Sequence, residues 1–93
     1  MTKPSTFLIV DDDRSYCSAL AAALQRRGHQ VFVAHNGDDA IEEAQLWKPS
    51  RAIVDLRMPG KSGLETVMAL RKALPELAMV VLTGYGSIAT AVE

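Results

Sequence analysis

Short apolar segments alternate with longer amphipathic segments along most of the chain. Four of the apolar segments predict strands, at residues 7–10, 31–34, 52–55 and 78–82. The first, third and fourth are almost continuous in apolar residues, which is typical of parallel strands that are covered on both faces. Glycine or proline flanks the last three segments and supplies the turns around them.

Between the strands, apolar residues recur at the spacing of one helix face. The stripes consist of Tyr16, Ala19, Leu20, Ala23 and Leu24; of Ala40, Ile41 and Ala44; and of Leu64, Val67, Met68 and Leu74. They predict three helices, which end at Gly28, before Pro49 and before Pro75. Ile88, Ala91 and Val92 predict the start of a fourth helix.

This alternation of strand and helix predicts an α/β fold. Right-handed crossovers between the strands give a doubly wound parallel sheet with helices on both faces, and the flavodoxin-like strand order is 2-1-3-4. The chain has 93 residues, of which 48% are apolar and 23% charged. This globular composition, with no internal repeat, predicts a single domain over residues 1–93.

Charge and cysteine content disfavour several classes of function. Ten Lys and Arg residues oppose eleven Asp and Glu residues, so a formal net charge of −1 favours neither nucleic acid nor anionic lipid as a direct partner. Cys17 is the only cysteine, which excludes a disulfide framework. No apolar run approaches the ~20 residues of a membrane span, and a signal peptide is lacking. We therefore expect a cytoplasmic location and no membrane partner.

Polar side chains follow three of the strands where ligands bind in such folds, at the carboxyl ends. Asp11, Asp12 and Asp13 follow the first strand, Asp55 ends the third, and Thr83 follows the fourth. Carboxylates this close repel one another unless a cation joins them, and a set of oxygen ligands favours Mg²⁺. A phosphoryl group arriving at one carboxylate would be neutralised by the metal and would accept a hydrogen bond from the hydroxyl.

Each of these residues also has a purely structural interpretation. Asp13 is either part of the cluster or the N-cap of the following helix. Asp55 alone fits an Asx turn, and Thr83 alone fits a β-branched strand residue. Their joint placement on one rim favours the functional interpretation. For the other notable side chains we expect packing roles: His29, His35, Trp47, Met68 and Met79.

Three motifs, in this order, resemble the receiver domain of two-component response regulators, the CheY-like fold. They are Leu-Ile-Val-Asp-Asp-Asp at 8–13, Ile-Val-Asp-Leu-Arg-Met-Pro-Gly at 53–60 and Val-Val-Leu-Thr-Gly-Tyr at 80–85. The resemblance covers almost the whole chain, from about residue 7 to residue 93. The stretch 80–93 is similar to the redox-responsive RegA-type branch, whose members carry a helix-turn-helix DNA-binding segment after the receiver.

The resemblance implies a phosphoacceptor signalling domain, not a turnover enzyme. Asp55 would accept a phosphoryl group from a sensor histidine kinase, and Thr83 would contact the phosphoryl oxygens. Mg²⁺ would be held by Asp12, Asp55 and the main-chain carbonyl of Arg57, with Asp11 acting mainly through water. The acidic pair could instead be Asp12 and Asp13, although the Ile-Val run before Asp11 favours the first frame. The side chains of Arg57 and Tyr85 would flank the mouth of the site.

The sequence departs from the family at its end, where we expect the fifth strand, with its Lys-Pro end, and the fifth helix to be lacking. None of Lys3, Lys48, Lys61 and Lys72 lies at a strand end that could replace the family lysine. Mg²⁺ binding should therefore survive more readily than phosphorylation-coupled switching. The exposed sheet edge and helix face predict a homo-oligomer. Any contact with DNA would come from an absent C-terminal helix-turn-helix.

Two other functions remain open at this point. Asp11-x-Asp13 after an apolar strand also resembles the motif of haloacid-dehalogenase-type phosphatases, in which Asp11 would be the nucleophile and Asp13 the general acid. The length of the chain argues against such an enzyme. A degenerate receiver that serves only as a protein-interaction surface is the third interpretation.

Overall fold

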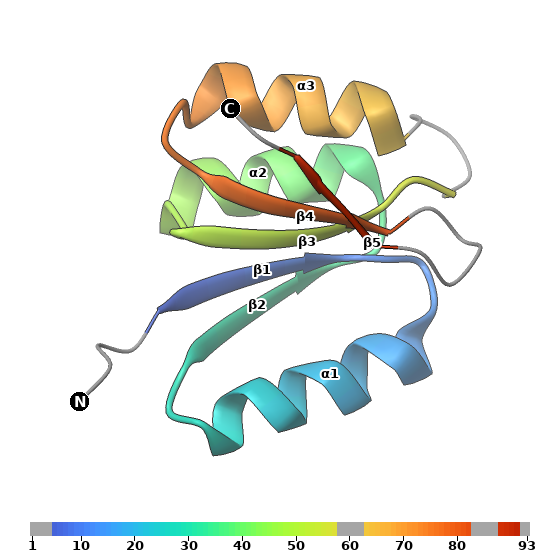
Figure 1. Cartoon of the computed structure of the whole chain (residues 1–93), viewed down its shortest axis with the longest axis vertical. Helices are drawn as coiled ribbons and strands as arrows, with labels where there is room; N and C mark the ends of the chain where they lie inside the picture. The colour runs from blue at the N-terminus through green and yellow to red at the C-terminus, as the bar shows by residue number, and fades with distance from the viewer. Residues whose placement is uncertain (1–4, 58–62, 83–87, 92–93) are drawn as a thin grey trace.

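A single sheet with helices on both faces organises the chain (Figure 1). The computed structural model describes residues 5–57, 63–82 and 88–91. The elements in chain order are β1 (Thr6–Val10), α1 (Arg14–Arg26), β2 (Gln30–Ala34), α2 (Gly37–Trp47), β3 (Arg51–Asp55), α3 (Gly63–Ala73), β4 (Ala78–Leu82) and β5 (Ile88–Ala91). Four of the strands and all three helices match segments that the sequence pattern predicts.

The order of strands in the sheet is β2-β1-β3-β4-β5. The first four are parallel, so the predicted order 2-1-3-4 and the doubly wound fold are confirmed. Helices α2 and α3 lie side by side on one face of the sheet, and α1 lies on the other (Figure 1). In the register, Val10 pairs with Ala34 on β2 and with Val54 on β3, so the carboxyl ends of these strands lie level.

The fifth strand is a correction to the prediction, because residues 88–91 form no helix. They form β5, which pairs antiparallel with β4 and aligns Ile88 with Leu82 and Ala91 with Met79. A short helical segment is costly to nucleate, whereas a strand satisfies the backbone groups along the edge of β4. The prediction that this sheet edge is unpaired is therefore wrong.

The core lies between the sheet and helices α2 and α3. Leu8, Val10 and Val54 are fully buried, as expected for central parallel strands. Met79 is 2% exposed, which confirms its core position, whereas Met68 is 64% exposed and does not pack in the core. The core cluster as a whole contains Leu8, Val10, Ala34, Ala40, Ala44, Ala52, Val54, Leu70, Leu77 and Met79.

Helix α1 is less buried than its apolar stripe predicts. Cys17 is its only buried residue, and Tyr16 and Ala19 are exposed. The stripe is only partly covered because α1 packs against β1 and β2 and, among the described elements, has no neighbouring helix on its face of the sheet (Figure 1).

Local interactions fix the ends of the helices and of β2. Asn36 caps α2 by accepting a hydrogen bond from the Asp39 amide at 2.8 Å, and Gly28 turns the chain after α1 at a φ of 90°. Trp47 stacks on Phe32 with ring centroids 4.5 Å apart, so its expected packing role at a helix end is confirmed.

None of the helices in the described ranges combines the length and the apolar character needed to cross a bilayer.

Candidate functional site

The loop after β1 begins with Asp11, which is 7% exposed. Its amide donates to the carbonyl oxygen of Ala34 at 3.1 Å, so the chain stays attached to β2 one residue beyond the strand. The Asp11 carboxylate then accepts a hydrogen bond from the Asp13 amide at 2.9 Å, which closes a tight turn. Asp12, at the corner of this turn, is exposed.

Asp13 serves a different purpose from its two neighbours. Its carboxylate accepts a hydrogen bond from the Tyr16 amide at 3.0 Å, and its backbone is extended, so it is the N-cap of α1. Of the two roles that the sequence left open for Asp13, the structure therefore shows the cap. The carboxylates that remain after β1 to form a cluster are those of Asp11 and Asp12.

The third carboxylate belongs to Asp55, the last residue of β3. Its Oδ1 accepts a hydrogen bond from the Arg57 amide at 3.0 Å, which turns the chain away from the sheet. Gly63, at the start of α3, packs against this turn so closely that a Cβ would lie 2.7 Å from the Asp55 carbonyl oxygen and closer still to the Leu56 Cα. Only glycine lets the helix approach the end of β3 in this way.

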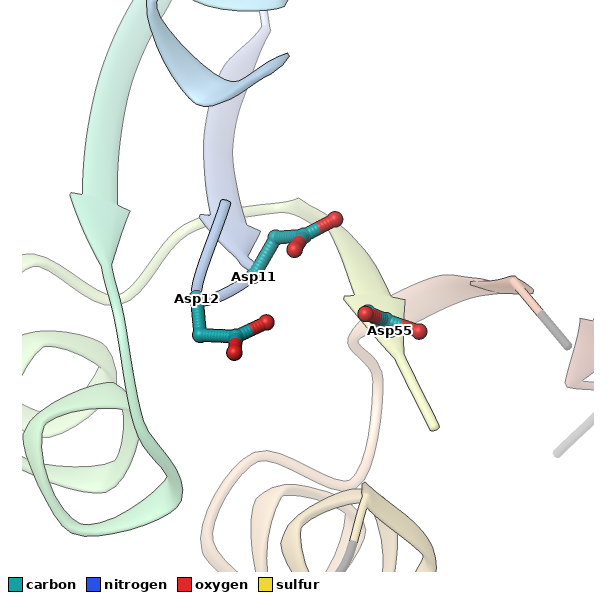
Figure 2. A group of neighbouring side chains, drawn as sticks. All are labelled: Asp11, Asp12 and Asp55. Atoms are coloured by element: carbon teal, nitrogen blue, oxygen red, sulfur yellow. The ribbon is translucent and has the colours of Figure 1, made fainter. Parts of the chain in front are cut away.

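The carboxylates of Asp11, Asp12 and Asp55 converge. Each offers one oxygen, and these oxygens all lie within 4.8 Å of one another. In Figure 2, Asp11 and Asp12 extend from the loop after β1 toward Asp55 at the end of β3. The level strand ends bring about this convergence, because β1 and β3 are adjacent parallel strands.

The cluster is electrostatically strained. Burial raises the pKa of the Asp11 carboxyl above its ordinary value of 3.8, and the charges of Asp55, Asp12 and Asp13 raise it further, against the lowering effect of the Asp13 amide. Burial and the charge of Asp11 also raise the pKa of Tyr16. Three oxygen donors that repel one another, one buried and the others partly or fully exposed, fit a hard divalent cation.

His35 and Cys17 contact the main chain of Asp11, and the sequence analysis identified neither of them as a site residue. The Asp11 carbonyl oxygen lies 2.9 Å from His35 Nδ1 and 3.3 Å from Cys17 Sγ. A packing role was all that the sequence suggested for His35. The signal that could have found it is its position one residue after β2, which the strand register places beside Asp11, one residue after β1.

Several predicted site residues fall outside the part of the chain that the structure describes. These are Thr83 and Tyr85; Lys61, for which no site role is expected, also lies outside the described residues. Arg57 is described, and its amide contacts Asp55, as stated above. The structure thus brings together Asp11, Asp12, Asp55 and the main chain of Arg57 out of the predicted set.

Comparison with known proteins gives matches to one family. Residues 7–93 match the model of the response regulator receiver domain. The photosynthetic apparatus regulatory protein RegA of Rhodobacter capsulatus is 45% identical over 87 residues, which are 94% of this chain and 47% of that protein. The chain therefore spans about half the length of this curated relative.

Two solved structures are similar in both fold and sequence. The crystal structure of a Burkholderia pseudomallei response regulator with a phosphorylated aspartic acid, calcium ion and citrate has a TM-score of 0.83 and 38% identity, covering 89% of this chain and 49% of that one. A chain from the crystal structure of histidine kinase ThkA in complex with response regulator protein TrrA has a TM-score of 0.81 and 31% identity, covering 89% and 72%.

Proposed function

Since this chain belongs to the family of response regulator receiver domains, we propose that Asp55 is its phosphoacceptor and that Asp11, Asp12 and Asp55 hold Mg²⁺. The observation that carries the proposal is the convergence of the three carboxylates within 4.8 Å. Asp55 is the member that comes from β3, and it is partly exposed, so an incoming phosphoryl group can reach it.

The step is a transfer of a phosphoryl group between two nucleophiles. A carboxylate oxygen of Asp55 attacks the phosphorus of a phosphohistidine protonated on its other ring nitrogen. The new O–P bond forms as the N–P bond breaks, which leaves an acyl phosphate on Asp55 and a neutral imidazole on the donor. A bound Mg²⁺ supplies the positive charge that offsets the carboxylates and the phosphoryl oxygens.

The residues around Asp55 orient it for this attack. The Arg57 amide donates a hydrogen bond to Oδ1 at 3.0 Å, and in this proposal Oδ2 is the attacking oxygen. Asp12 and the main-chain carbonyl of Arg57 complete the proposed metal ligands, with Asp11 acting mainly through water. Thr83 donates its hydroxyl to the phosphoryl oxygens in this proposal, and the side chains of Arg57 and Tyr85 flank the mouth of the site.

The proposed donor is a sensor histidine kinase. The Burkholderia pseudomallei relative contains a phosphorylated aspartic acid and a calcium ion, and TrrA is in complex with the histidine kinase ThkA. Both observations concern those proteins and support the same chemistry here. In this proposal the domain is a signalling module and not a turnover enzyme. Residues 1–93 form a single domain in the cytoplasm. Any control of transcription passes through a DNA-binding segment outside residues 1–93.

Homo-oligomerisation remains a prediction with weaker support. Strand β5 pairs with the edge of β4, which was expected to be exposed and available for a second chain. Leu64 and Met68, one turn apart on α3, are 61% and 64% exposed, so this apolar helix face is the proposed contact. Light scattering at increasing protein concentration tests this prediction, and a constant monomer mass would contradict it.

Acetyl phosphate with Mg²⁺ tests the phosphoacceptor directly. After incubation, peptide mapping by mass spectrometry should find one phosphoryl group on Asp55 of the wild-type chain and none in Asp55→Asn. Asp11→Asn is the informative second variant, because a phosphatase of the haloacid-dehalogenase type would use Asp11 as the nucleophile. Loss of the adduct in Asp11→Asn, with a normal adduct in Asp55→Asn, would contradict the proposal.

If neither the wild type nor either variant forms a phosphoryl adduct, the result favours the degenerate receiver. Among the described lysines, Lys48 is the C-cap of α2 and Lys72 lies in the last turn of α3. These helix ends lead into the starts of β3 and β4, whereas Asp55 lies at the other end of β3. Neither can neutralise a phosphoryl group there. If Mg²⁺ binds but no adduct forms, the metal site stands and the phosphoacceptor role fails.

A further inference from the structure

Both the amide and the carbonyl group of Asp11 are hydrogen-bonded, to the last residue of β2 and to the residue after it. Its amide donates to the Ala34 carbonyl oxygen at 3.1 Å, and its own carbonyl oxygen accepts from His35 Nδ1 at 2.9 Å. Cys17 Sγ approaches the same carbonyl oxygen at 3.3 Å from the first turns of α1. Both lone pairs of this carbonyl therefore have a donor.

The chemistry of the carbonyl fixes the direction of both hydrogen bonds. A carbonyl oxygen carries no hydrogen, so His35 must hold a proton on Nδ1 and Cys17 must hold its thiol proton. Cys17 is 2% exposed, which shields this contact from water.

His29, at the other end of β2, shows the opposite arrangement. The Ser5 amide lies 3.0 Å from His29 Nδ1, and because a backbone N–H can only donate, this ring nitrogen accepts. The two histidines of the chain thus bind backbone groups at opposite ends of the same strand. His29 is therefore a matched control for a histidine that stabilises the fold away from the acidic cluster.

We propose that His35 and Cys17 are positioning residues, which orient the peptide between Asp11 and Asp12 so that the two carboxylates converge on Asp55. This inference rests on the metal site of the proposed function. The peptide that starts with the Asp11 carbonyl ends with the Asp12 amide, so rotating it turns the Asp12 side chain away from Asp55. The hydrogen bond from the Asp13 amide to the Asp11 carboxylate restrains only the other end of this turn.

Substitutions at position 35 separate positioning from simple packing. His35→Ala removes the donor, whereas His35→Asn places an amide N–H close to where Nδ1 lies. His35→Gln places its amide farther out, near the former Nε2. We expect His35→Ala and His35→Gln to weaken Mg²⁺ binding roughly tenfold, as removal of a group that orients a metal ligand does. His35→Asn should restore most of the affinity.

Mg²⁺ titrations followed by the amide resonances of Asp12, Asp13 and Arg57 give the affinities, and urea unfolding gives the stability of each variant. His29→Ala should lose stability yet bind Mg²⁺ as the wild type does. Cys17→Ser, which keeps a donor, and Cys17→Ala, which does not, provide a second pair if His35→Ala fails to fold. In this pair the serine variant should bind Mg²⁺ more tightly.

Two results would overturn the inference. One is a Mg²⁺ affinity for His35→Ala within about twofold of the wild type, a change too small for a lost orienting contact. The other is equal weakening in His35→Ala and His35→Asn, which would show that the ring packs but does not orient. If the wild type itself shows no Mg²⁺ response, the proposed metal site fails, which is a distinguishable outcome.

Discussion

Asp11→Asn should make the metal-free protein more stable while it weakens the metal site. The substitution removes one negative charge from the cluster but keeps Oδ1, the atom that accepts the Asp13 amide at 2.9 Å. Burial and the neighbouring carboxylates raise the pKa of Asp11, so its ionised form is unfavourable in the folded protein. At neutral pH the neutral amide relieves that strain.

The magnitude follows from the distances in the cluster. The oxygens lie within 4.8 Å of one another, and two unit charges at that distance repel by about 0.9 kcal/mol in water. Asp11 makes two such pairs, with Asp12 and Asp55, and screening at 0.1 M salt reduces their sum to about 1 kcal/mol. For a domain of this size that raises the unfolding midpoint by about 4–8 °C.

Thermal unfolding in EDTA and in Mg²⁺ is the assay. In EDTA, Asp11→Asn should unfold at a higher temperature than the wild type, and Glu42→Gln, which removes an exposed charge from α2, should not. Mg²⁺ at ten times its dissociation constant should then stabilise the wild type by about 1.4 kcal/mol and the variant by much less. If Asp11→Asn is no more stable than the wild type in EDTA, the strain argument is refuted.

Three further predictions concern the cap, the glycine and the pH. Asp13→Ala should lower the free energy of unfolding by about 1 kcal/mol in urea titrations through loss of the cap, while Mg²⁺ affinity stays near that of the wild type. Gly63→Ala should disturb the turn after Asp55 and weaken both stability and Mg²⁺ binding, which calorimetry and metal titration measure together, because a Cβ would collide with Leu56. Between pH 3.8 and the raised pKa of Asp11 the folded state binds more protons than the unfolded state, so its stability should fall as pH rises through this window. Mg²⁺ affinity should rise over the same window, and the fall in stability should be smaller in Asp11→Asn.

The hydrophobic pattern was enough to predict the elements that form the central sheet. Residues 78–82 were predicted as a strand and form β4 with the same bounds, because a buried parallel strand leaves a continuous apolar signal. The receiver motifs, read in the order in which they occur, were enough for the family and the RegA-type likeness, which the family match and the 45% identity confirm. Both signals are local in sequence.

The features that the pattern could not supply depend on contacts between distant segments. Residues 88–91 read as a helix start, but the open edge of β4 makes a strand the better-paired state. Met68 fits a helix stripe, yet it faces outward because the neighbouring surface of α3 has no element packed on it among the described residues. His35 looked like a packing residue because only the strand register brings it beside Asp11.

In the proposed site, one divalent cation joins the carboxylates of Asp12, in the loop after β1, and Asp55, at the end of β3. A crystal soaked in Mn²⁺, which scatters anomalously and stands in for Mg²⁺, tests it most directly. We expect an anomalous peak within coordination distance of carboxylate oxygens of Asp12 and Asp55 and of the Arg57 carbonyl oxygen. A peak elsewhere on the protein, or side chains of Asp12 and Asp55 turned apart with no ion between them, would contradict it.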